Sequence, residues 1–264
     1  WDEPKNRSPG CIPHSFRLLT LGGTNRGKTN AMKQLFLKHQ STARKFKKLF
    51  IITCDERSVE WLDCEPDAVF QDMPDPDIFD IGEKVCLVID DFEFACMTSE
   101  NKRRLITLFR YISTHKSVSI MASYQSFFDC PSILRKIANV FLIYKPNSKV
   151  ELVSIANRIG MDADDLKDLF KQFCSEYYDF IMIDKTKNTP YPVRKNIYTI
   201  IDSGGGGLAL NINRLDLAAG LAAGFDFLLL AGGASLSINN WRNKPDISSA
   251  ERSAYWAGFC LISC

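Results

Sequence analysis

The sequence predicts a three-layer α/β fold built on a mainly parallel central sheet. From Ser15 to about Ile201, short runs rich in β-branched and aromatic residues alternate with amphipathic helical stretches. Several of the short runs are continuously apolar, which is typical of parallel strands covered on both faces. The gap Asp90–Lys116 is long enough for the helix that a right-handed crossover between parallel strands requires.

Each expected element follows from this alternation. The expected strands are Phe16–Leu21, Leu49–Cys54, Lys84–Ile89, Ser117–Tyr124, Val140–Tyr144 and Asp179–Ile183. The expected helices are Lys28–His39, Ser99–Ser113, Pro131–Ile137, Lys149–Ile159 and Asp162–Cys174. The last helix has a clear start, because Asp162 can cap it and apolar residues then recur at helical spacing. Met73–Asp77 carries two prolines and is expected to be an extended connector.

Composition excludes several classes of protein. The chain has 264 residues, of which 45% are hydrophobic and 24% charged, and its net charge is +2. These values are those of an ordinary globular protein and exclude disorder, collagen and coiled coil. The overall balance does not by itself call for a nucleic acid, a membrane or an acidic partner.

The cysteines indicate a reducing compartment. Nine are present, most lie within apolar runs, and no CxxC pair occurs. We expect buried, reduced thiols in the cytosol or nucleus rather than a zinc site. No secretory signal peptide is recognised, so the protein is not expected to be secreted. The chain opens on Trp1 rather than Met, and we expect the native start to be missing or processed.

Residues after Ser203 differ in character from the rest. Gly204–Gly207 opens a segment that holds nine of the 15 glycines and only 8 charged residues in 61. We therefore expect residues 1–203 to form the folded domain and 204–264 to be a poorly ordered or artefactual tail. No membrane span is expected, because Asp216 and Asp226 interrupt the apolar stretch. The longest uncharged run, Phe227–Trp241, has 15 residues, against about 20 needed to cross a bilayer.

A phosphate-binding motif follows the first expected strand and opens the first expected helix. It fits G-x-x-x-x-G-K-[ST] and comprises Gly22, Gly23, Thr24, Asn25, Arg26, Gly27, Lys28 and Thr29. Glycines allow backbone N–H groups to wrap the β- and γ-phosphates, and the helix N-terminus adds positive potential. We expect Lys28 to reach the β- and γ-phosphate oxygens and the Thr29 hydroxyl to ligate Mg²⁺.

Two carboxylates follow another apolar strand, about 60 residues further on. Asp90 and Asp91 come directly after Val85–Ile89. A parallel strand exposes its carboxyl end beside the phosphate loop, so Asp90 is expected to hold the Mg²⁺ hydration shell. Asp91 is expected to orient and deprotonate the attacking water, and Glu93 is a weaker candidate for this base. An acidic turn without function is the alternative interpretation of such a pair.

Gln125 stands at the tip of the next expected strand, Ser117–Tyr124. An amide there can hydrogen-bond both the γ-phosphate and the water, and so sense which nucleotide is bound. The order of phosphate loop, acid-tipped strand, helix and polar-tipped strand favours this role over that of a simple turn residue. This order predicts a P-loop NTPase fold of the RecA/ASCE-like type.

The sequence resembles the viral genome-packaging ATPases of the FtsK/HerA superfamily. This group includes the poxvirus A32-like ATPases and relatives in virophages and polinton- or adintovirus-like elements. The resemblance covers roughly Pro13 to Ile201. It rests on the segments Leu21–Thr29, Leu87–Asp91, His115–Gln125 with Pro131, Leu134, Arg135 and Asn139, and Phe180–Lys195. The last two segments make the assignment specific.

The resemblance implies an ATP-driven homo-oligomeric ring that pumps double-stranded DNA into a preformed capsid, whose protein is a further possible partner. It places the protein in the virion or the host-cell interior. Asp90, Asp91 and Gln125 then take the metal, base and sensor roles. Relatives often carry a trans-acting arginine where this chain has Thr114, so Arg110 is the substitute candidate. Other candidates are Arg103, Arg104 and Arg135.

Two basic runs are candidates for DNA contact. The first comprises Lys38, Arg44, Lys45, Lys47 and Lys48, and the second Arg194 and Lys195. Such runs are commonly only solvated surface. If they face a central pore, they would grip phosphates without reading bases, as a motor that moves any sequence requires.

Two other functions remain open. A small-molecule kinase shares the phosphate loop, but the carboxylate pair suits water activation and no arginine-rich lid is recognised. A nucleotide-binding but catalytically silent relic of an integrated viral element is suggested by the missing start, the displaced arginine and the unusual tail. The intact Lys28, Thr29, Asp90 and Asp91 argue against the relic.

Overall fold

The computed structural model describes residues 12–42, 45–54, 59–90, 92, 94, 97–187, 189–202 and 209–211. All of them lie in the compact unit Trp1–Ala219. Asp91, Glu93, Arg44 and the expected tail 204–264, apart from residues 209–211, fall outside these residues, and the division at residue 203 remains a prediction. Residues 209–211 form a strand that pairs with Thr199–Asp202.

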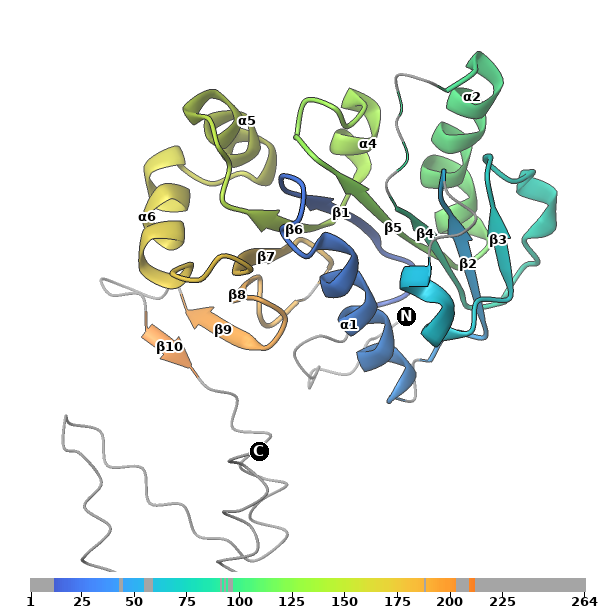
Figure 1. The fold of residues 1–264 in the computed structure, drawn as a ribbon. Helices are drawn as coiled ribbons and strands as arrows, with labels where there is room; N and C mark the ends of the chain where they lie inside the picture. Colours follow the sequence, from blue (N-terminus) through green and yellow to red (C-terminus); the bar gives the residue numbers. More distant parts are fainter. Residues whose placement is uncertain are drawn as a thin grey trace, which may run out of the picture. The chain divides into compact units, whose positions relative to one another are not determined.

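A single ten-stranded sheet forms the centre of this unit, in the order β10-β9-β8-β7-β6-β1-β5-β4-β2-β3 (Figure 1). The adjacent strands β6, β1, β5, β4, β2 and β3 run parallel to one another. β7 pairs antiparallel with β6, β8 with β7, β9 with β8 and β10 with β9. The bounds are β1 Arg17–Leu21, β2 Lys48–Ile52, β3 Ala68–Phe70, β4 Val85–Ile89, β5 Val118–Tyr124, β6 Val140–Tyr144, β7 Phe180–Asp184, β8 Val193–Lys195, β9 Thr199–Asp202 and β10 Ala209–Asn211.

Helices cover both faces of the sheet. Their bounds are α1 Lys28–Gln40, α2 Ser99–Thr107, α3 Ser113–His115, α4 Ser132–Ile137, α5 Lys149–Ile159 and α6 Ala163–Phe173. Short helices of other types are the 3-10 helices η1 Val59–Cys64 and η2 Pro76–Ile78 and the π-helical turn η4 Leu108–Ile112. Residues of α2, α4, α5 and α6 pack in one core cluster, and those of α1 and η1 in another. The predicted three-layer α/β fold is therefore confirmed.

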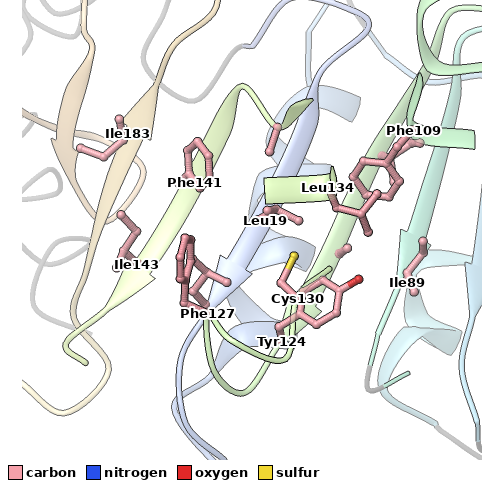
Figure 2. Packing of buried hydrophobic residues seen from close by; sticks show 14 of the residues in the cluster. Leu19, Ile89, Phe109, Tyr124, Phe127, Cys130, Leu134, Phe141, Ile143 and Ile183 are labelled. Carbon is pink, nitrogen blue, oxygen red and sulfur yellow. The ribbon is translucent and has the colours of Figure 1, made fainter. Parts of the chain in front are cut away.

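The core explains why the central strands are continuously apolar. Every residue of β4, β5, β6 and β7 is buried. Alternate side chains enter the two clusters, so that Leu87 and Ile89 pack on one face while Cys86 and Val88 pack on the other. Figure 2 shows the first of these layers, where Leu19 and Phe141 lie side by side on neighbouring strands and belong to the same cluster as Leu134 of α4.

All six expected strands and all five expected helices occur, with ends within about two residues. The sequence interpretation missed β3, β8, β9 and β10, each of three or four residues. Runs this short carry too few side chains for a periodic pattern, and their pairing depends on neighbours distant in sequence.

Two expectations need correction. The connector Met73–Asp77 does not stay extended, because Asp75 caps Asp77 N–H and Pro76 opens the 3-10 helix η2. The helix expected at Ser99–Ser113 continues to His115 and widens to π-helical geometry over Leu108–Ile112. Among the residues described, no helix has the length and apolarity that crossing a bilayer requires.

Candidate functional site

The predicted phosphate-binding motif lies between β1 and α1, at the carboxyl edge of the parallel strands (Figure 1). Gly22 N–H donates to the Tyr124 carbonyl of β5 at 3.1 Å, so the loop leaves the sheet beside that strand. Gly27 has a φ of +82° and accepts the first helical hydrogen bond, from Ala31 N–H at 3.0 Å. This left-handed conformation at the helix start is one that glycine adopts without steric cost.

Tyr144 of β6 explains why the loop begins with a glycine. A Cβ atom at Gly22 would lie 2.7 Å from Tyr144 Cβ, a distance that real structures do not tolerate. The Tyr144 hydroxyl donates to the Gly27 carbonyl at 3.0 Å, and burial raises the pKa of this phenol. The hydroxyl therefore stays protonated and ties the Gly27 end of the loop to β6.

Lys28 and Thr29 are the first residues of α1. The Lys28 side chain is 7% exposed, and its Nζ donates to the Gly23 carbonyl at 3.1 Å. The ammonium group thus lies over the loop it follows. Backbone N–H groups at the start of a helix and a lysine held over them attract phosphate.

Asp90 lies directly after β4, next but one to β1 in the sheet, and is 4% exposed. Its two carboxylate oxygens accept hydrogen bonds from different elements. Ser123 Oγ of β5 donates to Oδ1 at 2.7 Å, and Trp61 Nε1 of η1 donates to Oδ2 at 3.0 Å. These two donors fix the orientation of the carboxylate beside the phosphate loop.

Trp61 is a site residue that the sequence analysis missed. It is buried in η1, and η1 is tied to α1 because Lys33 Nζ donates to the Glu60 carbonyl at 2.6 Å and pairs with Asp63. The segment before it has no periodic pattern, and the sequence separates Trp61 from Asp90 by 29 residues. We find no sequence signal that would have placed this indole at the acid.

Gln125 follows β5 and reaches the phosphate loop. Thr24 Oγ1 donates to Gln125 Oε1 at 3.2 Å, and both side chains are exposed. The amide therefore stands at the same edge of the sheet as the loop and Asp90, where the sequence analysis predicted it.

The Mg²⁺ ligands expected from the sequence have suitable chemistry. A carboxylate at Asp90 and a hydroxyl at Thr29 are hard oxygen donors, which Mg²⁺ prefers, and Mg²⁺ commonly keeps several waters. Among the described residues no group of three or more His, Cys, Asp and Glu side chains could hold a metal by itself. This set fits a cation held jointly by the protein, by water and by a phosphate.

Arg110 lies far along the helix that begins at Ser99. The first turn of α2 is at the carboxyl edge, where Asn101 Nδ2 donates to Asp72 Oδ1 at 2.8 Å. Arg110 is 11 residues after Ser99, which corresponds to about 16 Å along a helix axis. One turn later, Thr114 Oγ1 accepts from Arg17 Nη1 at the amino end of β1. Arg110 is exposed and lies toward the amino edge of the sheet, far from the phosphate loop of its own chain.

The other candidate arginines have local partners. Arg103 and Arg104 both contact Glu100 on the same helix. Arg135 stacks over the ring of Phe127, with 4.6 Å between the guanidinium carbon and the ring centroid.

The predicted role of Arg194 in a DNA-contacting basic run needs correction. It is fully buried in β8, where its Nη2 donates to Asp184 Oδ2 at 2.9 Å and its Nε to the Tyr191 carbonyl. A buried guanidinium cannot contact DNA phosphates, so the prediction that Arg194 contacts DNA is wrong. Lys195 pairs with Asp179, and Lys48 with Glu83. Lys45 and Lys47 are exposed, at the amino edge of the sheet.

The cysteines are only partly as predicted. Of those described, Cys86 and Cys130 are buried, Cys64 and Cys174 are partly exposed, and Cys54 is exposed. All five are free thiols. Burial raises the pKa of Cys130 to about 12.

Comparison with known proteins identifies the fold. The chain matches no protein-family model and no curated protein sequence. It is similar to the genome-packaging NTPase B204 from Sulfolobus turreted icosahedral virus 2 in complex with AMPPCP, with a TM-score of 0.50, 14% identity, and coverage of 70% of this chain and 98% of that one.

A second structure, the DNA-packaging ATPase B204 from Sulfolobus turreted icosahedral virus, gives a TM-score of 0.50 and 15% identity over 68% of this chain and 95% of that one. These two structural neighbours are viral packaging NTPases, the kind of protein that the sequence resembles. At these identities the likeness establishes the α/β P-loop fold, as predicted.

Proposed function

We propose that this protein is a P-loop NTPase that hydrolyses ATP with Mg²⁺. The observation that carries the proposal is the convergence of the phosphate loop, Asp90 and Gln125 at one edge of the sheet. The fold shared with NTPases, one of them in complex with a nucleotide analogue, supports it.

Each residue has a distinct role in this proposal. Backbone N–H groups of the loop and the Lys28 ammonium bind the β- and γ-phosphates. Thr29 and Asp90 would hold Mg²⁺, which when bound supplies positive charge to the polyphosphate. Asp91 orients the attacking water and accepts its proton, and Gln125 hydrogen-bonds this water and the γ-phosphate. Gln125 then contacts both Thr24 of the loop and the nucleotide, so that a change in the bound nucleotide also alters the contact between Gln125 and the loop.

We further propose that hydrolysis moves double-stranded DNA, as in packaging of a viral genome into a capsid. Support comes from the amino edge of the sheet, opposite the phosphate loop. Cations lie at this edge on several elements, with Asp67 and Glu83 near the start of β2, and the cations are Arg17, Lys45, Lys47, Lys84, Lys116, Lys136, Arg158 and Lys185. We call these residues the basic edge. Lysines and arginines presented in this way bind phosphates without reading base sequence.

We also propose a homo-oligomeric ring, in which Arg110 would act in trans. Because Arg110 lies far from the phosphate loop of its own chain, it could act only on a nucleotide that a neighbouring subunit holds close to it. A trans-acting arginine stabilises charge on the transferred phosphoryl group, and its loss costs about 10³-fold or more in rate.

Two substitutions test the catalytic assignment. Lys28→Ala is expected to abolish ATP binding, because the variant lacks the ammonium group that pairs with the β- and γ-phosphates. Asp91→Asn is expected to leave ATP binding nearly unchanged while lowering hydrolysis by about 10³-fold, because an amide cannot accept the proton. Binding is measured by calorimetry and hydrolysis by phosphate release. Normal hydrolysis by Asp91→Asn would contradict the assignment of the base.

The motor proposal is tested by the rate of ATP hydrolysis over a range of protein concentration, with and without long duplex DNA at low salt. A ring predicts a rate per subunit that rises with concentration and with DNA, and Arg110→Ala should remove this rise. A background rate with intact nucleotide binding would indicate a silent relic instead.

A further inference from the structure

A pair of exposed tyrosines stands beside the phosphate loop without a role in the chemistry described so far. Tyr177 and Tyr178 lie in the turn between α6 and β7 and are 54% and 65% exposed. Their rings form an edge-to-face pair, with centroids 5.2 Å apart. Neither was singled out by the sequence analysis.

Two contacts join this tyrosine pair to the phosphate loop. Arg26 Nη1 donates to the Tyr177 carbonyl at 3.0 Å, and the Arg26 guanidinium carbon lies 4.2 Å from the centroid of the Tyr177 ring. Tyr178 lies over the end of the loop, because a Cβ atom on Gly27 would be 3.4 Å from Tyr178 Cδ1. The rings are therefore within reach of a nucleotide bound by the loop.

The turn that carries the tyrosines is held rigidly. The Asp179 carboxylate is buried and accepts hydrogen bonds from Glu176 N–H at 3.0 Å and Asn196 Nδ2 at 3.2 Å. Lys195 Nζ pairs with the same carboxylate at 2.9 Å. Burial tends to raise the pKa of Asp179, but these donors outweigh it and the pKa is lowered. Exposed rings on a rigid turn lose little entropy when a ligand stacks on them.

The order of the strands indicates which end of a nucleotide would face the tyrosines. Asp90 and Gln125 follow β4 and β5, on one side of β1, while the tyrosines precede β7, on the other side. A polyphosphate on the loop that presents its γ-phosphate to Asp90 must direct its nucleoside toward β6 and β7. The tyrosine pair lies on that side.

We propose that Tyr178, supported by Tyr177 and Arg26, forms the subsite for the nucleoside of the bound nucleotide, by stacking on the base. This inference rests on the proposed nucleotide binding at the loop. Stacking reads the face of a base and not its edge, so the subsite accepts adenine and guanine alike. The nucleotide is then held at both ends, at its phosphates by the loop and the Mg²⁺ site of Asp90 and at its base by Tyr178. Both contacts position the γ-phosphate.

Calorimetric titration of the full chain with ADP and with pyrophosphate tests this subsite, because only ADP carries a base. Tyr178→Ala should weaken ADP binding by about 5- to 150-fold, the range that corresponds to one base–aromatic stack, and leave pyrophosphate binding unchanged. The affinity of Tyr178→Ala for GDP should fall by a similar factor. Tyr178→Phe keeps the ring and should bind ADP as the unsubstituted protein does.

A matched control is Tyr198→Ala, since Tyr198 is 48% exposed but lies between β8 and β9, beside Lys38 at the far end of α1. It should leave both titrations unchanged. Unaltered ADP affinity in Tyr178→Ala, with pyrophosphate still bound, would overturn the tyrosine subsite alone. Failure of the unsubstituted chain to bind either ligand would overturn the proposed function and, with it, this inference.

Discussion

At the scale of single residues, the indole of Trp61 helps to orient the carboxylate of Asp90, the proposed Mg²⁺ ligand. Trp61→Phe keeps the buried ring but removes the N–H that donates to Asp90 Oδ2. Because outer partners of a metal ligand typically contribute 10- to 100-fold in metal affinity, we expect the Mg²⁺ concentration for half-maximal hydrolysis to rise by about tenfold or more. The measurement is the hydrolysis rate as a function of free Mg²⁺ at saturating ATP.

Ser119→Ala is the control for this substitution. Ser119 is a buried serine of the same strand as Ser123, but its hydroxyl contacts His14 and Phe16 N–H at the other end of β5. It should leave the Mg²⁺ dependence unchanged even if it lowers the melting temperature. An unchanged Mg²⁺ dependence in Trp61→Phe would show that the indole serves packing alone.

At the scale of elements, the buried ion pair of Arg194 and Asp184 joins β8 to β7. Asp184 also accepts hydrogen bonds from the Thr186 and Thr189 side chains, so its charge is fully surrounded by donors. Arg194→Leu would leave this carboxylate buried without its cation. We expect the free energy of unfolding, measured by denaturant titration, to fall by about 3–5 kcal/mol.

The double variant Arg194→Leu with Asp184→Leu separates the pair from its surroundings. It should recover part of the stability that the single variant loses, because no uncompensated charge remains, while the Thr186 and Thr189 hydroxyls lose their acceptor. Arg103→Ala, which breaks an exposed pair with Glu100, should not change stability measurably. A single variant as stable as the unsubstituted protein would contradict this account.

At the scale of the whole domain, the two proposed binding sites lie at opposite edges of the sheet. The nucleotide site is proposed at the carboxyl edge, and DNA contact is proposed at the basic edge defined above. Replacing Lys45 and Lys47 by Ala should weaken binding to duplex DNA equally for all sequences. The slope of log affinity against log salt should fall by about one for each DNA phosphate that the variant no longer neutralises.

Fluorescence anisotropy with labelled duplexes at several salt concentrations measures this slope. The matched control is Lys167→Ala with Lys171→Ala, two exposed lysines of α6 away from the basic edge. An equal weakening of binding in the two double variants would mean that DNA binding follows total charge and not this edge.

Those features of the protein that depend on short-range pattern follow from the amino-acid sequence alone. The motif Gly22–Thr29 requires a strand before it and a helix after it, and apolar strands such as Val85–Ile89 can only be buried ones. Asp90 and Gln125 were therefore predicted at one edge, because parallel strands end on the same side. The larger helices were equally predictable from their periodicity and caps.

Contacts between separate segments of the chain became visible only in the folded structure. It placed Trp61 on Asp90, Tyr177 beside Arg26 and Arg194 inside the molecule on Asp184. A sequence pattern reports how a residue relates to its neighbours within a few positions, and these pairs are separated by 29, 151 and 10 residues. Whether a charged or aromatic side chain is surface, core or site depends on which strands pair. That depends on the packing of the whole sheet.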